Sequence, residues 1–185
     1  MRAFSILSIA LALFASANAA AVDKRAISSN VQTCVNDITA AGTQLTAVKS
    51  DVAGFTSAAG YSGALAIHTK EQALENLLKT ATTSCCVQKT TVTDEEAAAV
   101  LNVISTLVPN IETTLSSLVS KKSQFDTILL ATTLVKTDIK NLKTQTSALD
   151  TCLVAVTPSA YTTDANGYVT RVNAAFTSAS TAYGI

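Results

Sequence analysis

The chain has 185 residues, with 13 basic side chains, 13 acidic side chains and one histidine, so its formal net charge at pH 7 is zero. Only 14% of the residues are charged, and serine and threonine supply much of the remaining polar surface. The sequence has no extended basic patch, which argues against a nucleic-acid partner. With 48% hydrophobic residues, the chain can bury the core of one domain of moderate size.

The first 25 residues have the pattern of a secretory leader. Residues 1–20 combine an early positive charge, an apolar run and small residues at the end, which predicts a signal peptide. Lys24 and Arg25 then resemble a fungal processing site, so we expect a short propeptide over 21–25; the alternative is an ordinary exposed basic pair. The expected product is secreted, either extracellular or associated with a cell wall. We expect no later membrane span, and no GPI anchor because the chain end lacks a hydrophobic tail.

Apolar residues at helical spacing predict the first two helices. In the first, steps of three and four residues connect Val31 to Phe55, and the pattern ends near Gly60. The second is expected over about 64–81, with several leucines on one face. The tract over 82–93 is rich in β-branched and hydroxyl side chains, and we expect it to be a loop tethered by disulfides.

The stretch over 93–153 predicts two long amphipathic helices joined at 121–123. Phe125 and Ile128 are assigned to the second of these helices. Because the connection is short, we expect the two helices to fold back and bury their apolar stripes against each other. Pro109 lies inside the first one and predicts a kink or a break there.

The residues after Pro158 predict either a fifth helix packed on the bundle or a mobile tail. A turn is expected over 162–167, followed by aromatic residues at helical spacing. The predicted fold is therefore all-α, an up-down bundle of four to five amphipathic helices tethered by disulfides at one end. The bundle domain is expected over 26–157, with the C-terminal helix or tail over 158–185.

Four cysteines in a secreted chain predict disulfide bonds. In an up-down bundle Cys34, Cys85, Cys86 and Cys152 all fall at one end, and a bond between the two neighbours is strained. Each neighbour is thus expected to pair with one of the other two, but the sequence leaves the pairing open. Each bond is expected to contribute roughly 3–4 kcal/mol. The cysteine spacing does not fit zinc, so we expect no metal site.

The sequence has no constellation of catalytic residues. The only histidine, His68, lies within an expected helix, and no nucleophile elbow or phosphate-binding glycine loop occurs. A histidine at the margin of an apolar face is usually a structural residue. We therefore expect neither an enzyme nor a cofactor.

Three segments carry a family resemblance, namely ALAIH at 64–68, LVPNIE at 107–112 and LVSKKSQF at 118–125. With their order and surroundings, over about 27–156, the chain resembles the fungal hydrophobic surface-binding protein A (HsbA) family, also called cell wall galactomannoproteins. The resemblance implies a secreted helical domain that adsorbs to hydrophobic surfaces or encloses a fatty acid between its helices. It also implies recruitment of a secreted cutinase-like esterase as a possible partner.

Together, the apolar stripes and the resemblance lead to a first hypothesis, a carrier whose core holds a fatty acid or another lipid. The few aromatic residues would fill such a core thinly and leave room for an acyl chain. The candidate lining residues come from the stripes of the expected helices: Leu45, Val52, Phe55, Leu74, Leu78, Leu107, Ile111, Phe125, Ile128 and Val135.

Two other hypotheses remain open. A surface-active adhesin would dock on wax or plastic through the aromatic residues of the last segment, Tyr168, Phe176 and Tyr183. A structural or antigenic cell wall mannoprotein would instead have an ordinary packed core and bind no ligand, because an apolar stripe is more often core than cavity.

Overall fold

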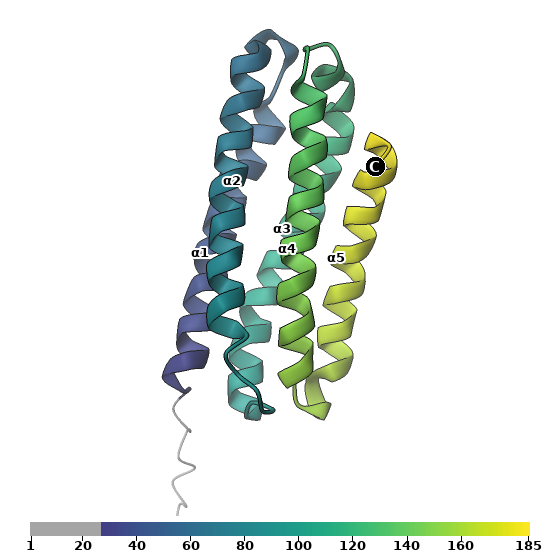
Figure 1. Ribbon diagram of the computed structural model, residues 1–185. Helices are drawn as coiled ribbons and strands as arrows, with labels where there is room; N and C mark the ends of the chain where they lie inside the picture. The colour runs from purple at the N-terminus through teal and green to yellow at the C-terminus, as the bar shows by residue number, and fades with distance from the viewer. Residues whose placement is uncertain (1–26) are drawn as a thin grey trace, which may run out of the picture.

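The computed structural model describes residues 27–185. The signal peptide, the propeptide and the processing pair Lys24 and Arg25 lie outside the described residues, and they stay predictions. The described part contains five α-helices and no strand, which confirms the all-α prediction (Figure 1). The helices are α1 (Ser29–Gly54), α2 (Gly60–Cys85), α3 (Asp94–Asp126), α4 (Ala131–Val156) and α5 (Thr162–Tyr183), with short 3₁₀ turns at Ser57–Ala59 and Ser159–Tyr161.

The five helices run side by side in a closed ring (Figure 1). Helix α1 packs against α2 and α3, α5 packs against α3 and α4, and α2 packs against α4. The consecutive helices α3 and α4 contact each other little, so the prediction that they bury their stripes against each other is wrong. Each of these stripes faces the middle of the ring instead, and the ring order leaves α3 and α4 on different sides of the molecule's interior.

The connection between α3 and α4 also lies further along the chain than predicted. Residues 121–123 continue α3, which ends only at Asp126, and the turn comprises residues 127–130. Lys121 lies within α3, and its Nζ donates a 2.8 Å hydrogen bond to the carbonyl of Phe55, at the end of α1. Phe125 is therefore a residue of α3, and Ile128 lies in the turn.

Helix α3 is continuous over 33 residues, so the predicted break at Pro109 does not occur. Its first turn is well capped: Thr93 and Glu96 form the two reciprocal hydrogen bonds of a capping box. Glu96 also accepts a 3.0 Å hydrogen bond from the backbone N–H of Ser28, which caps α1. One carboxylate thus joins the beginnings of two adjacent helices.

By length and composition alone, α3 could cross a membrane, contrary to the expectation that no stretch is long enough. In the described part of the chain it behaves as a bundle helix. Three acidic residues occupy its first turn, and one of its faces packs against α1 and α5.

The last segment is a helix packed on the bundle, not a mobile tail. The turn expected over 162–167 is the first part of α5. Phe176 and Tyr183 are buried in the core, and the Tyr183 hydroxyl donates a 2.8 Å hydrogen bond to the Leu118 carbonyl of α3. The adhesin hypothesis requires these two side chains to contact a foreign surface. Because they are buried, they are not available for that contact.

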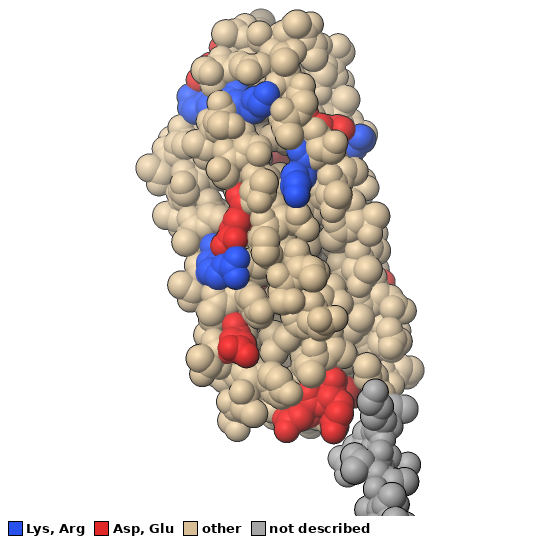
Figure 2. All heavy atoms as spheres, turned by 180° about the vertical axis from the view of Figure 1, so that it is seen from behind, with Lys and Arg blue, Asp and Glu red and all other residues tan. Residues whose placement is uncertain are grey.

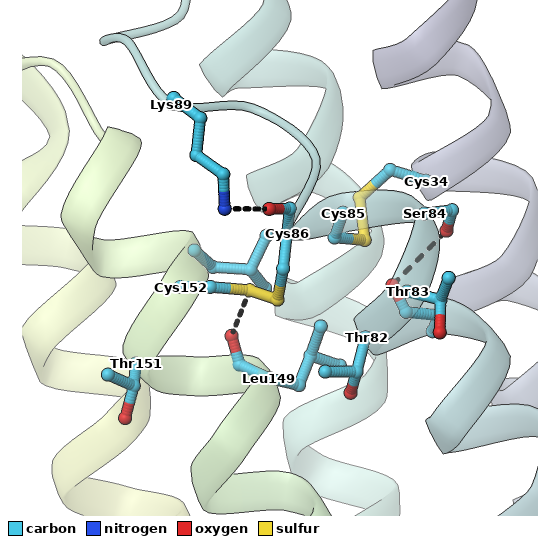
Figure 3. The surroundings of a disulfide bond; sticks show 12 residues. Cys34, Thr82, Thr83, Ser84, Cys85, Cys86, Lys89, Leu149, Thr151 and Cys152 are labelled. Carbon is cyan, nitrogen blue, oxygen red and sulfur yellow. Dashed lines mark hydrogen bonds between the residues drawn. A yellow bond between two sulfur atoms is a disulfide. The ribbon is translucent and has the colours of Figure 1, made fainter.

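All four cysteines are joined at one end of the bundle, as predicted (Figure 3). Cys34 pairs with Cys85 and links α1 to α2, while Cys86 pairs with Cys152 and links the end of α2 to α4. Lys89, in the loop that follows, donates a 2.9 Å hydrogen bond to the Cys86 carbonyl (Figure 3). The two bonds leave adjacent residues in different directions and hold three helices together.

Candidate functional site

A cavity lies inside the helix ring. It leaves about 80 Å³ of room for the centres of water-sized molecules, within about 1060 Å³ of empty space that includes solvent at its openings. All five helices contribute to its wall, and most of the lining side chains are aliphatic. The cavity follows from the ring order, because all five helices lie around the centre of the bundle and none of them fills it.

Seven of the ten residues proposed from the sequence line this cavity. They come from α1, α2, α3 and α4: Leu45, Val52, Leu74, Leu78, Leu107, Ile111 and Val135. Phe55 and Phe125 do not line it; their rings stack on each other with centroids 4.1 Å apart, and both are fully buried. Ile128 is also absent from the wall, since it lies in the turn between α3 and α4.

Sequence reasoning missed the contribution of α5. Tyr168, Val172 and Phe176 line the cavity on one face of this helix. Their spacing of four residues was visible in the sequence, but none of them was included among the candidate lining residues. The signal that points inward is that the rest of α5 is polar, so that this stripe is the only face it can bury.

A second cavity, with about 50 Å³ of room for the centres of water-sized molecules, lies beside the Cys34–Cys85 bond. It shares Ile104, Asp150 and Tyr168 with the first cavity, so the two spaces adjoin at these residues. Together they give the interior an elongated space that extends toward the disulfide end.

The wall of the central cavity contains an unusual polar feature, the carboxyl group of Glu71. Only 2% of this residue is exposed, and neither of its carboxyl oxygens accepts a hydrogen bond from a donor among the described residues. Asp138 of α4 lies next to it and is also buried. Burial, then the nearby Asp138 and Glu75, raise the pKa of Glu71 well above its ordinary value, so this side chain is uncharged at neutral pH.

Asp138 differs from Glu71 because its carboxyl group has a ring nitrogen as a hydrogen-bond partner. Its Oδ1 lies 2.6 Å from Nδ1 of His68, the only histidine of the chain. Burial raises the pKa of Asp138 to about 6, while the hydrogen bond with His68 opposes this rise. His68 is therefore a hydrogen-bonded structural residue in the described structure, in line with the sequence-based interpretation. Burial also raises the pKa of Asp150 to about 6.

The side-chain atoms of His68, Glu71 and Asp138 lie within 4.8 Å of one another, close enough for a metal ion to be considered. Two of the three are already joined by the short His68–Asp138 hydrogen bond. We therefore interpret the group as a hydrogen-bonded pair beside an uncharged acid, and the absence of a metal site stays a prediction.

The surface contrasts with this acidic interior. Figure 2 shows one face of the molecule on which charged side chains are few and separated by wide uncharged areas. Large apolar side chains are exposed chiefly in two places, at Tyr61 and Leu65 early in α2 and at Leu129 and Leu130 in the turn before α4. Leu130 has a φ of 70°, a left-handed conformation that is costly for a residue with a side chain.

Comparison with known proteins decides the family. Residues 31–155, which are more than half of the chain, match the model of the hydrophobic surface binding protein A family. The chain belongs to this family. A search of curated proteins gives no match.

Solved structures with the same fold give a closer comparison. The chain is 25% identical to AfMP4p, solved in complex with palmitic acid, with a TM-score of 0.77 over 83% of this chain and 99% of that one. It is 16% identical to ligand binding domain 1 of the Penicillium marneffei MP1 protein, solved with arachidonic acids; the TM-score is 0.72, over 85% of this chain and 98% of that one. The second MP1 ligand binding domain is 15% identical, also with a TM-score of 0.72, over 84% and 94% of the two chains. At these lower identities the MP1 domains support the fold alone.

Proposed function

We propose that this family member is a non-enzymatic carrier that holds the acyl chain of a fatty acid in the central cavity. The observation that supports this most is the apolar cavity enclosed by all five helices. A protein of the same fold and 25% identity binds palmitic acid, which identifies the ligand class. A fully packed core would have favoured the alternative of a structural wall protein without a ligand.

The expected affinity follows from the apolar surface that the ligand would bury. Ten methylene groups at about 0.8 kcal/mol each contribute about 8 kcal/mol before the costs of association. Losing translational freedom and ordering the chain take back a part of this free energy. A dissociation constant in the micromolar range, about 10⁻⁶ M, is the expected result.

The place of action that we propose is outside the cell. The leader pattern of residues 1–25 and the two disulfide bonds support secretion, since such bonds form and persist in oxidising compartments. The disulfides also suit a carrier, because they hold one end of the bundle together.

Lipid extraction with native mass spectrometry tests the carrier function. The protein is expressed with its leader, secreted and purified, and its mass is compared before and after extraction with organic solvent. A bound mass in the fatty-acid range, lost on extraction and restored by one equivalent of palmitate, is the expected result. Extracted protein that takes up no palmitate would reject the carrier.

The exposed apolar turn supports a second candidate function, adsorption to hydrophobic surfaces. Leu129 is 85% exposed and Leu130 is 59% exposed, although large apolar side chains normally avoid water. The left-handed backbone at Leu130 places a leucine where glycine or asparagine would be less strained, which points to a role for the side chain.

Depletion onto hydrophobic beads tests this second function. We expect the variant Leu129→Ser/Leu130→Asn to adsorb several-fold less than the natural protein, and to be no less stable because the turn is exposed. A matched control, Val87→Ser, removes one half-exposed apolar residue next to the disulfides, near the opposite end. Equal depletion of all three proteins would reject the turn as the adsorbing surface.

A further inference from the structure

We propose that the Glu71 cluster is a head-group subsite that accepts an uncharged, hydrogen-bonding group, so that a fatty acid binds there in its un-ionised form. The inference rests on the proposed carrier function and adds the chemical class of the head group. An alcohol or an un-ionised carboxylic acid fits the subsite, and an ionised carboxylate does not.

The carboxyl group of Glu71 lacks a hydrogen-bond donor, which supports this subsite. Leaving a buried polar group without a hydrogen bond costs free energy, so such groups in proteins normally have partners. No described residue donates a hydrogen bond to Glu71, although its own proton can be shared with the acids Asp138 and Glu75, and it lies in the wall of a cavity that is otherwise largely apolar. A ligand hydroxyl placed there could donate to one Glu71 oxygen and would supply the missing partner.

The charge of the cavity walls also favours an uncharged head group. Three acids line the two adjoining cavities, namely Glu71, Asp138 and Asp150, whereas no Lys, Arg or His of the described chain does. The nearest basic side chain of this cluster, His68, already pairs with Asp138. An anionic head group inside the ring would therefore be desolvated without any cation to compensate its charge.

The remaining helices add no compensating charge. Toward the central cavity α1 presents only apolar side chains, α3 adds the hydroxyl of Thr114, and α5 adds the phenol of Tyr168. Glu75, one turn after Glu71 on α2, is also buried beside the cluster, and one of its oxygens is 3.8 Å from the half-exposed Lys79. The side chains that surround the subsite thus favour neutral groups over anions.

Glu71 shows what these surroundings do to a carboxyl group. Burial and the neighbouring acids hold Glu71 in its protonated form well above its ordinary pKa. A fatty-acid carboxyl group beside it would meet the same low dielectric and the same acidic neighbours. Binding at neutral pH then requires the uptake of a proton, and the affinity for a fatty acid falls as the pH rises.

The experiment uses two ligands of the same chain length, lauric acid with a ¹³C-labelled carboxyl group and 1-dodecanol. Binding is measured between pH 7 and pH 9 in the presence of EDTA, and the ¹³C chemical shift reports the ionisation of the bound acid. We expect the bound carboxyl group to stay un-ionised over this whole pH range, although its ordinary pKa is about 4–5. The affinity for lauric acid should fall about tenfold for each pH unit, while that for 1-dodecanol changes little.

Two variants and a control assign the effect to the subsite. Glu71→Gln keeps an uncharged hydrogen-bonding group and should bind 1-dodecanol as well as the natural protein does. Glu71→Leu removes that group and should weaken 1-dodecanol binding about fivefold, the effect of one hydrogen bond. The control Glu95→Gln changes an exposed acid in the first turn of α3 and should have no effect.

The outcomes separate this inference from the carrier function. A bound carboxyl group that ionises like the free acid, with a lauric acid affinity that is flat from pH 7 to pH 9, would overturn the head-group subsite and leave the carrier intact. If neither ligand binds, the carrier function fails and the subsite fails with it.

Discussion

Replacing Ala64 by phenylalanine should fill part of the cavity without destabilising the protein. Ala64 is buried near the start of α2, and its side chain lines the cavity. The added ring would occupy existing space and bury apolar surface, so we expect the free energy of unfolding to stay within about 1 kcal/mol of the natural value or to rise. If the ring excludes about three methylene groups of a bound acyl chain, the loss at about 0.8 kcal/mol each is about 2.4 kcal/mol, or roughly 60-fold in affinity.

Ala81 on the same helix provides the matched control. It is fully buried, but it lines neither cavity. Phenylalanine at this position has no space to enter, and overpacking of a close-packed core typically costs about 1–3 kcal/mol. Denaturant unfolding gives the stability of both variants, and palmitate titration by displacement of a fluorescent probe gives their affinity. Equal destabilisation by the two substitutions, with unchanged palmitate binding by the Ala64 variant, would refute the cavity.

Three further predictions concern stability. The double variant Cys86→Ala/Cys152→Ala opens a loop of 66 residues and should lose about 4 kcal/mol of unfolding free energy in denaturant titrations; a loss below about 1 kcal/mol would contradict the tether. Hydrogen bonds from Ser28 and Thr93 lower the pKa of Glu96, so its stabilisation is present above the ordinary carboxyl pKa and is lost as the pH falls through the lowered value. Glu96→Gln should therefore cost about 1 kcal/mol at pH 7 and progressively less in acid, and an equal cost at pH 7 and pH 2 would count against this linkage. The raised pKa of Glu71 has the opposite effect on the free energy of unfolding. The stabilising contribution of Glu71 is fully present below the ordinary carboxyl pKa and is lost as the pH rises toward the raised value. Glu71→Gln should thus raise the melting temperature more at pH 8 than at pH 4.5, and a uniform shift would contradict the assignment.

The helical faces could be predicted from the sequence because each helix buries one stripe. Val52, Leu107 and Val135 were assigned to the interior by periodicity alone, and all three line the cavity. The capping box at Thr93 was also visible, since its residues are local in the chain. The disulfide end followed from the up-down topology, which places residues far apart in the sequence at one end of the bundle.

The neighbours of each helix could not be predicted in this way. A stripe shows which face is buried, but not which helix covers it, so α3 and α4 were wrongly paired. The turn was misplaced because Lys121 and Lys122 look like a helix end, whereas Lys121 instead satisfies the Phe55 carbonyl, 66 residues earlier in the chain. The burial of Glu71 could not be predicted either, since it depends on the approach of α4.

Photochemical labelling tests the central claim, an acyl chain inside the helix ring, most directly. The secreted protein is loaded with a palmitate analogue that carries a diazirine in its chain, irradiated, and mapped by tandem mass spectrometry. The account predicts labels on cavity residues of different helices, such as Leu45, Leu107 and Val135, that are lost when unlabelled palmitate competes. Labels confined to the exposed side chains Tyr61, Leu65, Leu129 and Leu130 would contradict it.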